Sequence, residues 1–104
     1  MQIQINTDSN IALDERGEKH YTSLIDDSLK RFEDGITRVE VHLSDENSDK
    51  FGTDDKRCLM EVRLNGRQPI VVINTADTSE KAFSGSLDKM KRKLGSIFDK
   101  MRNH

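Results

Sequence analysis

In residues 37–44, TRVEVHLS, every second side chain from Val39 onward is apolar. This period of two is typical of a β-strand with one buried face, because successive side chains of a strand point to opposite sides of the sheet. We therefore predict that Val39, Val41 and Leu43 face the core and that His42 faces outward.

The same alternation returns after a polar run that ends at Asp55. Its apolar positions are expected in the core: Cys58, Met60, Val62 and Leu64. Asn65-Gly66 follows at once and is a strong hairpin signal, since both residues tolerate a positive φ. A further strand is predicted from Ile70 to Asn74, after Pro69, which is tolerated at the start of a strand.

One more strand and a helix precede these segments. In residues 2–6, QIQIN, polar and apolar side chains alternate with period two, and residues 7–10, TDSN, are of types that are common in turns. From about Asp14 to Phe32 apolar or small residues recur at helical spacing, and Asp34-Gly35 is expected to end this helix. The stripe consists of Gly17, Tyr21, Leu24, Ile25, Ser28 and Phe32.

The last element is a long amphipathic helix, predicted to begin at Thr78 or Ser79 and to end near Arg102. Its apolar stripe consists of Phe83, Leu87, Met90, Leu94, Ile97, Phe98 and Met101. At 100° per residue, Lys89, Lys93 and Lys100 share one flank of the stripe, Lys91 and Arg102 the other, and Arg92 lies on the back. Positive charge therefore borders the core-facing surface of this helix on both sides.

These elements predict an α+β fold in the order β-α-β-β-β-α, with a four-stranded mixed sheet and two helices on one face. The first strand-helix-strand unit requires a right-handed crossover and parallel strands, whereas the short later connections favour antiparallel pairing. With 104 residues, of which 33% are hydrophobic and 35% charged, the chain is expected to form a single thin domain over residues 1–104.

The net charge of −2 conceals a strong asymmetry along the chain. Residues 1–55 hold 6 Lys and Arg against 14 Asp and Glu, whereas residues 56–104 hold 11 against 5. One face of the protein can therefore be basic while another is acidic. A net acidic charge does not exclude binding to a polyanion such as nucleic acid.

Composition disfavours several classes of protein. A single cysteine cannot form an internal disulfide, and no apolar run approaches the length of a membrane span. No basic segment followed by an apolar one opens the chain. We therefore expect a cytoplasmic protein without a membrane partner.

Acidic residues crowd the segment between the two alternating stretches, and a metal site can be assembled on paper from His42, Asp45, Asp49, Asp54, Asp55 and Cys58. They show neither calcium-loop spacing nor a paired Cys/His pattern, so we predict no metal and no cofactor. Cys58 lies on the inward side of its strand and is expected to be a buried apolar residue rather than a nucleophile. The sequence shows no Ser-His-Asp, paired-carboxylate or phosphate-loop arrangement. We therefore expect that the protein is not an enzyme and has no small-molecule substrate.

Three segments resemble the ribosome hibernation and ribosome-associated inhibitor family: VEVHLSDEN (39–47), DDKRCLMEVRL (54–64) and SLDKMKRKL (86–94). The resemblance covers nearly the whole chain. It implies a fold like the double-stranded-RNA-binding domain and a protein that occupies the mRNA and tRNA channel of the small ribosomal subunit, where it blocks translation. It also implies that the chain ends without the dimerisation domain of the family's long members and is monomeric off the ribosome.

The family's contacts with ribosomal RNA are mainly basic residues of the closing helix and the sheet. Matched by position, they correspond to Lys56, Arg57, Lys89, Arg92, Lys93, Lys100 and Arg102. The partners implied by the resemblance are therefore the small ribosomal subunit and its rRNA.

Two alternatives remain open from the residues alone. An acidic protein-interaction module would present Asp26, Asp27, Glu33 and Asp34 to a basic partner. A generic double-stranded-RNA binder would use the same lysines but recognise the shape of an isolated A-form duplex.

Overall fold

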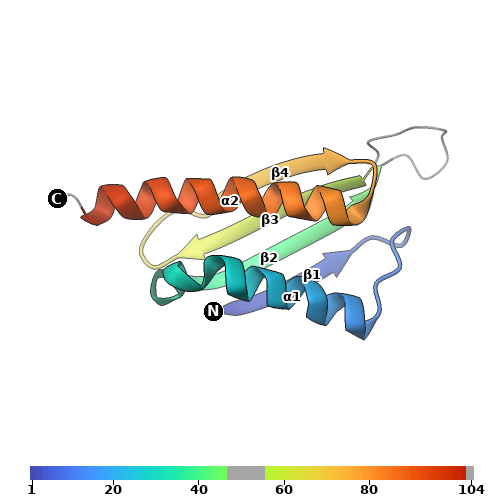
Figure 1. Ribbon diagram of the computed structural model, residues 1–104, viewed down its shortest axis with the longest axis horizontal. Coiled ribbons are helices and arrows are strands. Elements are labelled where there is room, and N and C mark those ends of the chain that lie inside the picture. The colour runs from blue at the N-terminus through green and yellow to red at the C-terminus, as the bar shows by residue number, and fades with distance from the viewer. Residues whose placement is uncertain (47–55, 103–104) are drawn as a thin grey trace.

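The computed structural model describes residues 1–46 and 56–102 and confirms the predicted order of elements (Figure 1). The elements are strand β1 (Gln2–Thr7), helix α1 (Glu15–Leu29), the 3-10 helix η1 (Lys30–Gly35), strands β2 (Ile36–Asp45), β3 (Lys56–Leu64) and β4 (Ile70–Ala76), and helix α2 (Ser79–Arg102). The acidic positions Asp49, Asp54 and Asp55 lie outside the described residues.

The four strands form one mixed sheet in the order β1-β2-β3-β4. β1 and β2 are parallel, as expected for strands joined through a helix, and the other two pairs are antiparallel. α1 and α2 cover the same face of this sheet and leave the other face open (Figure 1). The predicted α+β architecture is therefore confirmed.

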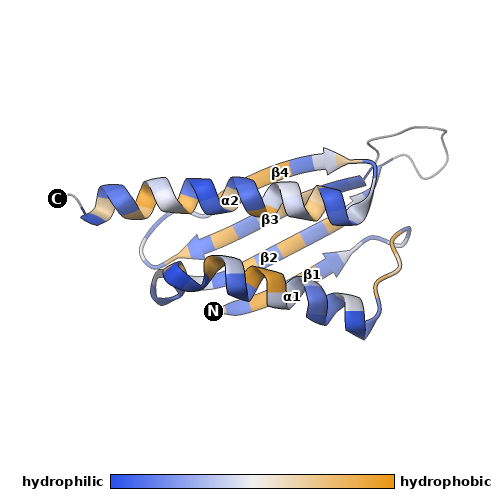
Figure 2. Cartoon of the chain, in the orientation of Figure 1, coloured by the Kyte–Doolittle hydropathy of each residue, from blue (hydrophilic) through white to orange (hydrophobic). Residues whose placement is uncertain are grey.

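The core lies between the helices and the sheet, on the side that the alternation predicted. Eleven of the fourteen apolar positions predicted on β2, β3 and α2 are buried: Val39, Val41, Leu43, Cys58, Met60, Val62, Leu64, Phe83, Leu87, Met90 and Leu94. The other three lie near the end of α2, where Ile97 and Phe98 are half-buried and Met101 is exposed. Figure 2 shows the resulting alternation of hydrophobic and hydrophilic bands along β2 and β3. The ring of Tyr21 packs against that of Phe83, with 4.4 Å between centroids, and joins the two helices.

The first helical segment differs from the prediction in two ways. Asp14 is its N-cap, because Oδ1 accepts a hydrogen bond of 2.8 Å from the backbone N–H of Gly17. The α-helix then ends at Leu29 and tightens into η1, which carries Phe32 into the core. Leu29, absent from the predicted stripe, is fully buried, whereas Gly17, Leu24 and Ser28 are only half-buried.

The prediction for Met101 was wrong, because its side chain is 42% exposed. A helix of 24 residues is about 36 Å long, whereas β4, with 7 residues, spans only about 23 Å. The last turn of α2 therefore projects beyond the sheet (Figure 1). β4 itself ends at Ala76 rather than at Asn74.

The hairpin between β3 and β4 is longer than a two-residue turn. Gly66 has a φ of +69°, as the sequence suggested, and the N–H of Arg67 bonds the carbonyl of Leu64 at 3.4 Å. The ladder of paired residues, however, ends at Val62 and Ile70. The turn is therefore followed by an extended return to β4.

Candidate nucleic-acid interface

Helix α2 is anchored at its start and in its middle, which fixes the surface that it presents to solvent. Thr78 caps it, since the Oγ1 atom accepts a hydrogen bond of 3.1 Å from the N–H of Lys81. Farther along, the buried hydroxyl of Ser86 donates to the carbonyl of Cys58 on β3. From Lys89 to Arg102 the helix then carries six cations and one carboxylate, that of Asp99.

All five predicted RNA-binding residues on this helix are exposed: Lys89, Arg92, Lys93, Lys100 and Arg102. Within residues 1–46 and 56–102, Arg92, Lys93 and Lys100 make no ion pair, and the same holds for Lys91. A cation without a carboxylate partner can exchange its water and counterions for a phosphate without first breaking a salt bridge. These four residues are hereafter the α2 cations.

Lys89 is held differently. Its Nζ atom donates a hydrogen bond of 2.8 Å to the backbone carbonyl of Ile73 on β4. This bond places its flank of α2 beside β4, and Lys93 lines a hollow with Ile70 and Val71 on the same side. The flank that was assigned from helical spacing to Lys89 and Lys93 therefore runs along the edge of the sheet.

The opposite flank of α2 faces η1. Arg31 lies with its Cζ atom 4.3 Å from the ring centroid of Phe32, and its guanidinium approaches Gly95. Arg102 pairs with Asp99 at 2.8 Å, one turn earlier on the helix. Of the predicted helix cations, Arg102 thus already has a carboxylate partner.

The two predicted cations of the sheet are also paired. Lys56 Nζ lies 3.4 Å from Asp45 Oδ2, directly across the β2–β3 ladder. Arg57 Nη1 lies 3.4 Å from Glu46 Oε1. The structure therefore divides the predicted set into three groups: α2 cations without a carboxylate partner (Arg92, Lys93 and Lys100), Lys89 on a backbone carbonyl, and cations paired with a carboxylate (Lys56, Arg57 and Arg102).

Cations on the open face of the sheet are neutralised as well. Arg38 Nε donates to Glu40 Oε1 at 2.7 Å, and its guanidinium also bonds two glutamine side chains of β1. The hydrogen bond from Arg38 holds the pKa of Glu40 below its ordinary value. Arg63 pairs in the same way with Glu61 at 3.1 Å.

This open face also lacks a stacking platform for bases. No Phe, Tyr or Trp occurs in any of the four strands. The ring of His42 does face outward, as predicted, and its side chain is half exposed, with Nε2 3.9 Å from Glu40 Oε2. Sheet surfaces that read single-stranded RNA stack bases on several aromatic rings, so this face does not fit that mode.

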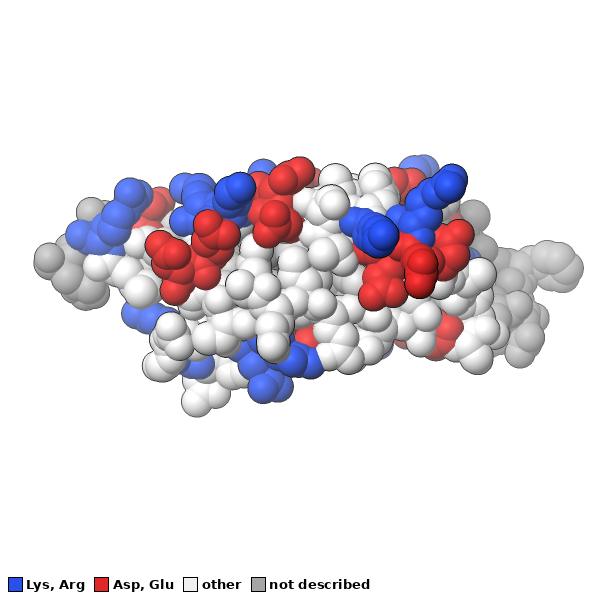
Figure 3. Space-filling view, turned by 90° about the horizontal axis from the view of Figure 1, so that it is seen from below, with Lys and Arg blue, Asp and Glu red and all other residues white. Residues whose placement is uncertain are grey.

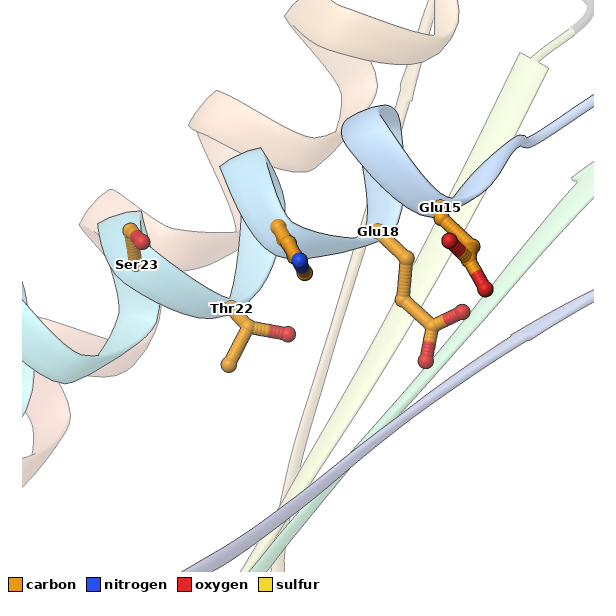
Figure 4. Close-up of a pocket in the computed structure, with 5 residues that line it drawn as sticks. Glu15, Glu18, Thr22 and Ser23 are labelled. Carbon is orange, nitrogen blue, oxygen red and sulfur yellow. The ribbon is translucent and has the colours of Figure 1, made fainter.

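The acidic surface of α1 and η1 does not form a single patch. Asp26, Asp27, Glu33 and Asp34 are exposed, as the acidic-module alternative requires. In Figure 3, however, acidic groups lie among basic ones along this face. An open hollow of about 490 Å³ on α1 is lined by Glu15, Glu18, Lys19, Thr22 and Ser23, with both signs of charge and no buried polar group (Figure 4).

Chemistry at Cys58 is disfavoured by its surroundings. The side chain is fully buried, and this burial raises the pKa of the thiol to about 11.

In the described part of the chain, no three His, Cys, Asp or Glu side chains come together as metal ligands. Nor is any described helix long and apolar enough to cross a membrane.

Comparison with known proteins decides the family. The family model for sigma 54 modulation protein / S30EA ribosomal protein matches residues 3–102. The chain belongs to this family. Its members are ribosome-associated modulation proteins, and the family is not known as one of enzymes. The expected association with the ribosome is therefore confirmed at the level of the family.

Solved structures show the same fold at low sequence identity. The N-terminal domain of Thermus thermophilus Protein Y is 19% identical with a TM-score of 0.72, over 93% of this chain and 99% of that one. A ribosomal subunit interface protein from Coxiella burnetii is 17% identical with a TM-score of 0.70, over 95% of this chain and 99% of that one. No curated protein sequence matches the chain significantly.

Sequence reasoning left one α2 cation out of the predicted set. Lys91 is exposed and unpaired in the described structure, like Arg92 and Lys93 beside it. Helical spacing had already placed Lys91 beside the apolar stripe, so the sequence alone could have included it. The pairing of Arg57 with Glu46 could not be predicted in this way, because it depends on the register of the strands.

Proposed function

We propose that this protein binds the rRNA of the small ribosomal subunit in the mRNA and tRNA channel and thereby inhibits translation in the cytoplasm. A bound protein there excludes mRNA and tRNA sterically, without any reaction, cofactor or metal. Membership of the family supports the ribosome as the partner. The four α2 cations support rRNA as the molecule that is contacted.

The observation that carries the proposal is the contrast between the cations of α2 and those of the sheet. The cations of the sheet, Arg38, Lys56, Arg57 and Arg63, each have a carboxylate within 3.4 Å. The α2 cations have none within the described residues and project from one helix. A polyanion gains most where positive charge is uncompensated, since each phosphate contact then releases a counterion.

Co-sedimentation with purified small ribosomal subunits tests this proposal. The variant Arg92→Gln, Lys93→Gln, Lys100→Gln should lose at least tenfold in affinity and lose inhibition of translation in a cell-free system. All three side chains are exposed, so the fold should be retained.

A matched control removes the same charge from the other helix. Arg16→Gln, Lys19→Gln, Lys30→Gln changes three exposed cations of α1 and η1, and should bind nearly as the parent does. Equal losses in both variants would show only a dependence on net charge and would contradict a specific role of α2. Equal binding of the parent to subunits and to an isolated RNA duplex would favour the generic duplex binder.

A further inference from the structure

The outer edge of β4 has no strand partner in the described structure. β4 is the last strand in the order β1-β2-β3-β4, and Figure 1 shows it as the outermost strand beside α2. An edge strand presents backbone N–H and C=O groups that can pair with another extended chain. We therefore ask which side chains lie beside this edge and which kind of chain could pair with it.

The hydrogen bond from Lys89 shows which backbone groups face outward. Because Lys89 Nζ reaches the carbonyl of Ile73 from α2, that carbonyl points away from β3. In an antiparallel ladder the N–H and C=O of one residue point to the same side, and alternate residues repeat the direction. Val71, Ile73 and Thr75 therefore present their backbone groups to the outer edge.

The same stretch exposes apolar side chains. Val71 is 43% and Ile73 is 40% exposed, and they are two of the three large apolar residues that are exposed in the described structure. At one end of the edge lies an open hollow of about 380 Å³, lined by Pro69, Ile70, Val71, Lys93, Ser96 and Ile97. Edge strands in soluble proteins are usually kept short, charged or covered, so this combination is a candidate docking surface.

Charge decides what can dock there. Lys89 and Lys93 stand on the flank of α2 beside the edge. A second copy of this chain, pairing β4 with β4, would bring two sets of these lysines together, and like charges would oppose the contact. An extended segment with carboxylates fits instead.

We propose that the edge of β4 takes an acidic peptide as a fifth strand. The peptide backbone pairs with Val71 and Ile73, its apolar side chains cover those two residues, and its carboxylates lie against Lys89 and Lys93. Lys89 must first leave the carbonyl of Ile73, and a carboxylate on the peptide gives its ammonium group a new partner. Lys89 therefore selects acidic strands over neutral ones, in the mode known as strand addition.

A capped peptide of alternating glutamate and valine, seven residues long, is a direct probe, with a lysine-valine peptide as its charge-reversed control. Titration into ¹⁵N-labelled protein should shift the amide signals of Val71, Ile73 and Thr75, and the lysine peptide should not. Shifts confined to α1, or equal binding of both peptides, would overturn the proposal.

Two variants separate edge pairing from simple charge attraction. Ile73→Pro removes an outward N–H without removing a bond to β3, and it should weaken the acidic peptide about tenfold, the size expected for one lost hydrogen bond plus the loss of local fit. Ile73→Val keeps the N–H and should bind within about threefold of the parent. If a proline variant that retains the parent's circular dichroism binds the peptide normally, the edge is not used.

Titration of the labelled protein with a single-stranded RNA heptamer tests whether RNA, rather than a peptide, binds this edge. If RNA shifts the β4 backbone amides and the acidic peptide does not, the edge belongs to the RNA interface and the peptide site is refuted. Peptide binding is measured on the parent protein without ribosomes. Subunit binding that stays unchanged in the α2 variant would therefore overturn the proposed rRNA contact and leave the peptide result standing.

Discussion

The hydroxyl of Ser86 donates a hydrogen bond of 2.7 Å to the backbone carbonyl of Cys58, and both residues are fully buried. Ser86 is the only buried polar side chain among the residues that the structure describes. This bond ties the middle of α2 to β3. It therefore fixes how the helix is rotated, and with it the direction in which the α2 cations project.

Replacing Ser86 by alanine should lower the free energy of unfolding by about 1–2 kcal/mol, because a buried hydrogen bond is lost and the higher helix propensity of alanine offsets only part of that loss. Chemical denaturation followed by circular dichroism measures this change. Ser84→Ala is the matched control, since Ser84 is exposed two residues earlier on the same helix, and it should change stability by less than about 0.5 kcal/mol. Equal effects of the two variants would contradict the role given to the Cys58 contact.

The thiol of Cys58 should not react with a disulfide reagent at pH 8 in the folded protein, and should react fully in denaturant. Burial raises the pKa of this thiol from an ordinary 9.0 to about 11. A raised pKa stabilises the folded state below the pKa of the unfolded chain, and this contribution is lost as the pH rises through the folded value. Stability should therefore fall between about pH 9 and 11.

Cys58→Ala tests the origin of that alkaline loss. The variant should be less stable at neutral pH by about 1 kcal/mol, because a small cavity is left, but its stability should fall less steeply above pH 9. Some dependence should remain, since burial also raises the pKa of Tyr21. An unchanged slope would mean that Cys58 does not contribute.

Two glycines should respond in opposite directions to alanine. A Cβ atom on Gly35 would lie 2.8 Å from the Phe98 ring, which packs on Phe32 with 4.9 Å between centroids, so Gly35→Ala should cost about 1–3 kcal/mol. On Gly95 the nearest atom is Nη2 of the flexible Arg31 side chain, at 3.1 Å. Gly95→Ala should therefore stabilise α2 by up to about 1 kcal/mol, and thermal unfolding of the two variants would show opposite shifts.

The sequence predicted the strands and their buried faces well because period-two alternation reports burial directly. Val39, Val41, Met60 and Val62 are all fully buried as expected. The helical segment before β2 was harder to predict. Its change to a 3-10 helix after Leu29 depends on where Phe32 can reach the core, which propensity does not encode.

For the candidate site, the sequence predicted the cations but could not predict their partners. Helical spacing is enough to place Lys93 and Arg92 on the outside of α2. Salt bridges such as that between Arg57 and Glu46 require the register of β2 against β3, and the bond from Lys89 to Ile73 requires the packing of α2 beside β4. Long-range pairing of this kind is a tertiary property.

The ion pair of Arg57 provides a test of whether the end of β3 takes part in binding. Glu46→Gln would remove the carboxylate 3.4 Å from Arg57 while keeping the shape of the side chain. If Arg57 contacts rRNA, this variant should bind small subunits about two- to threefold more tightly, since an exposed ion pair of up to about 1 kcal/mol no longer competes. Glu33→Gln, an exposed change of equal charge on η1, is the control and should have little effect.

The salt dependence of subunit binding should report the number of phosphates that the α2 cations contact. Each Lys or Arg that neutralises a phosphate releases counterions, so the logarithm of the binding constant should fall linearly with the logarithm of salt concentration. Removing one contact should flatten this slope by about one unit, and Arg92→Gln, Lys93→Gln, Lys100→Gln should flatten it by about two to three units. The control Arg16→Gln, Lys19→Gln, Lys30→Gln should leave the slope as in the parent. A slope that is unchanged in the α2 variant, measured at several salt concentrations by co-sedimentation, would place the rRNA contacts on another surface.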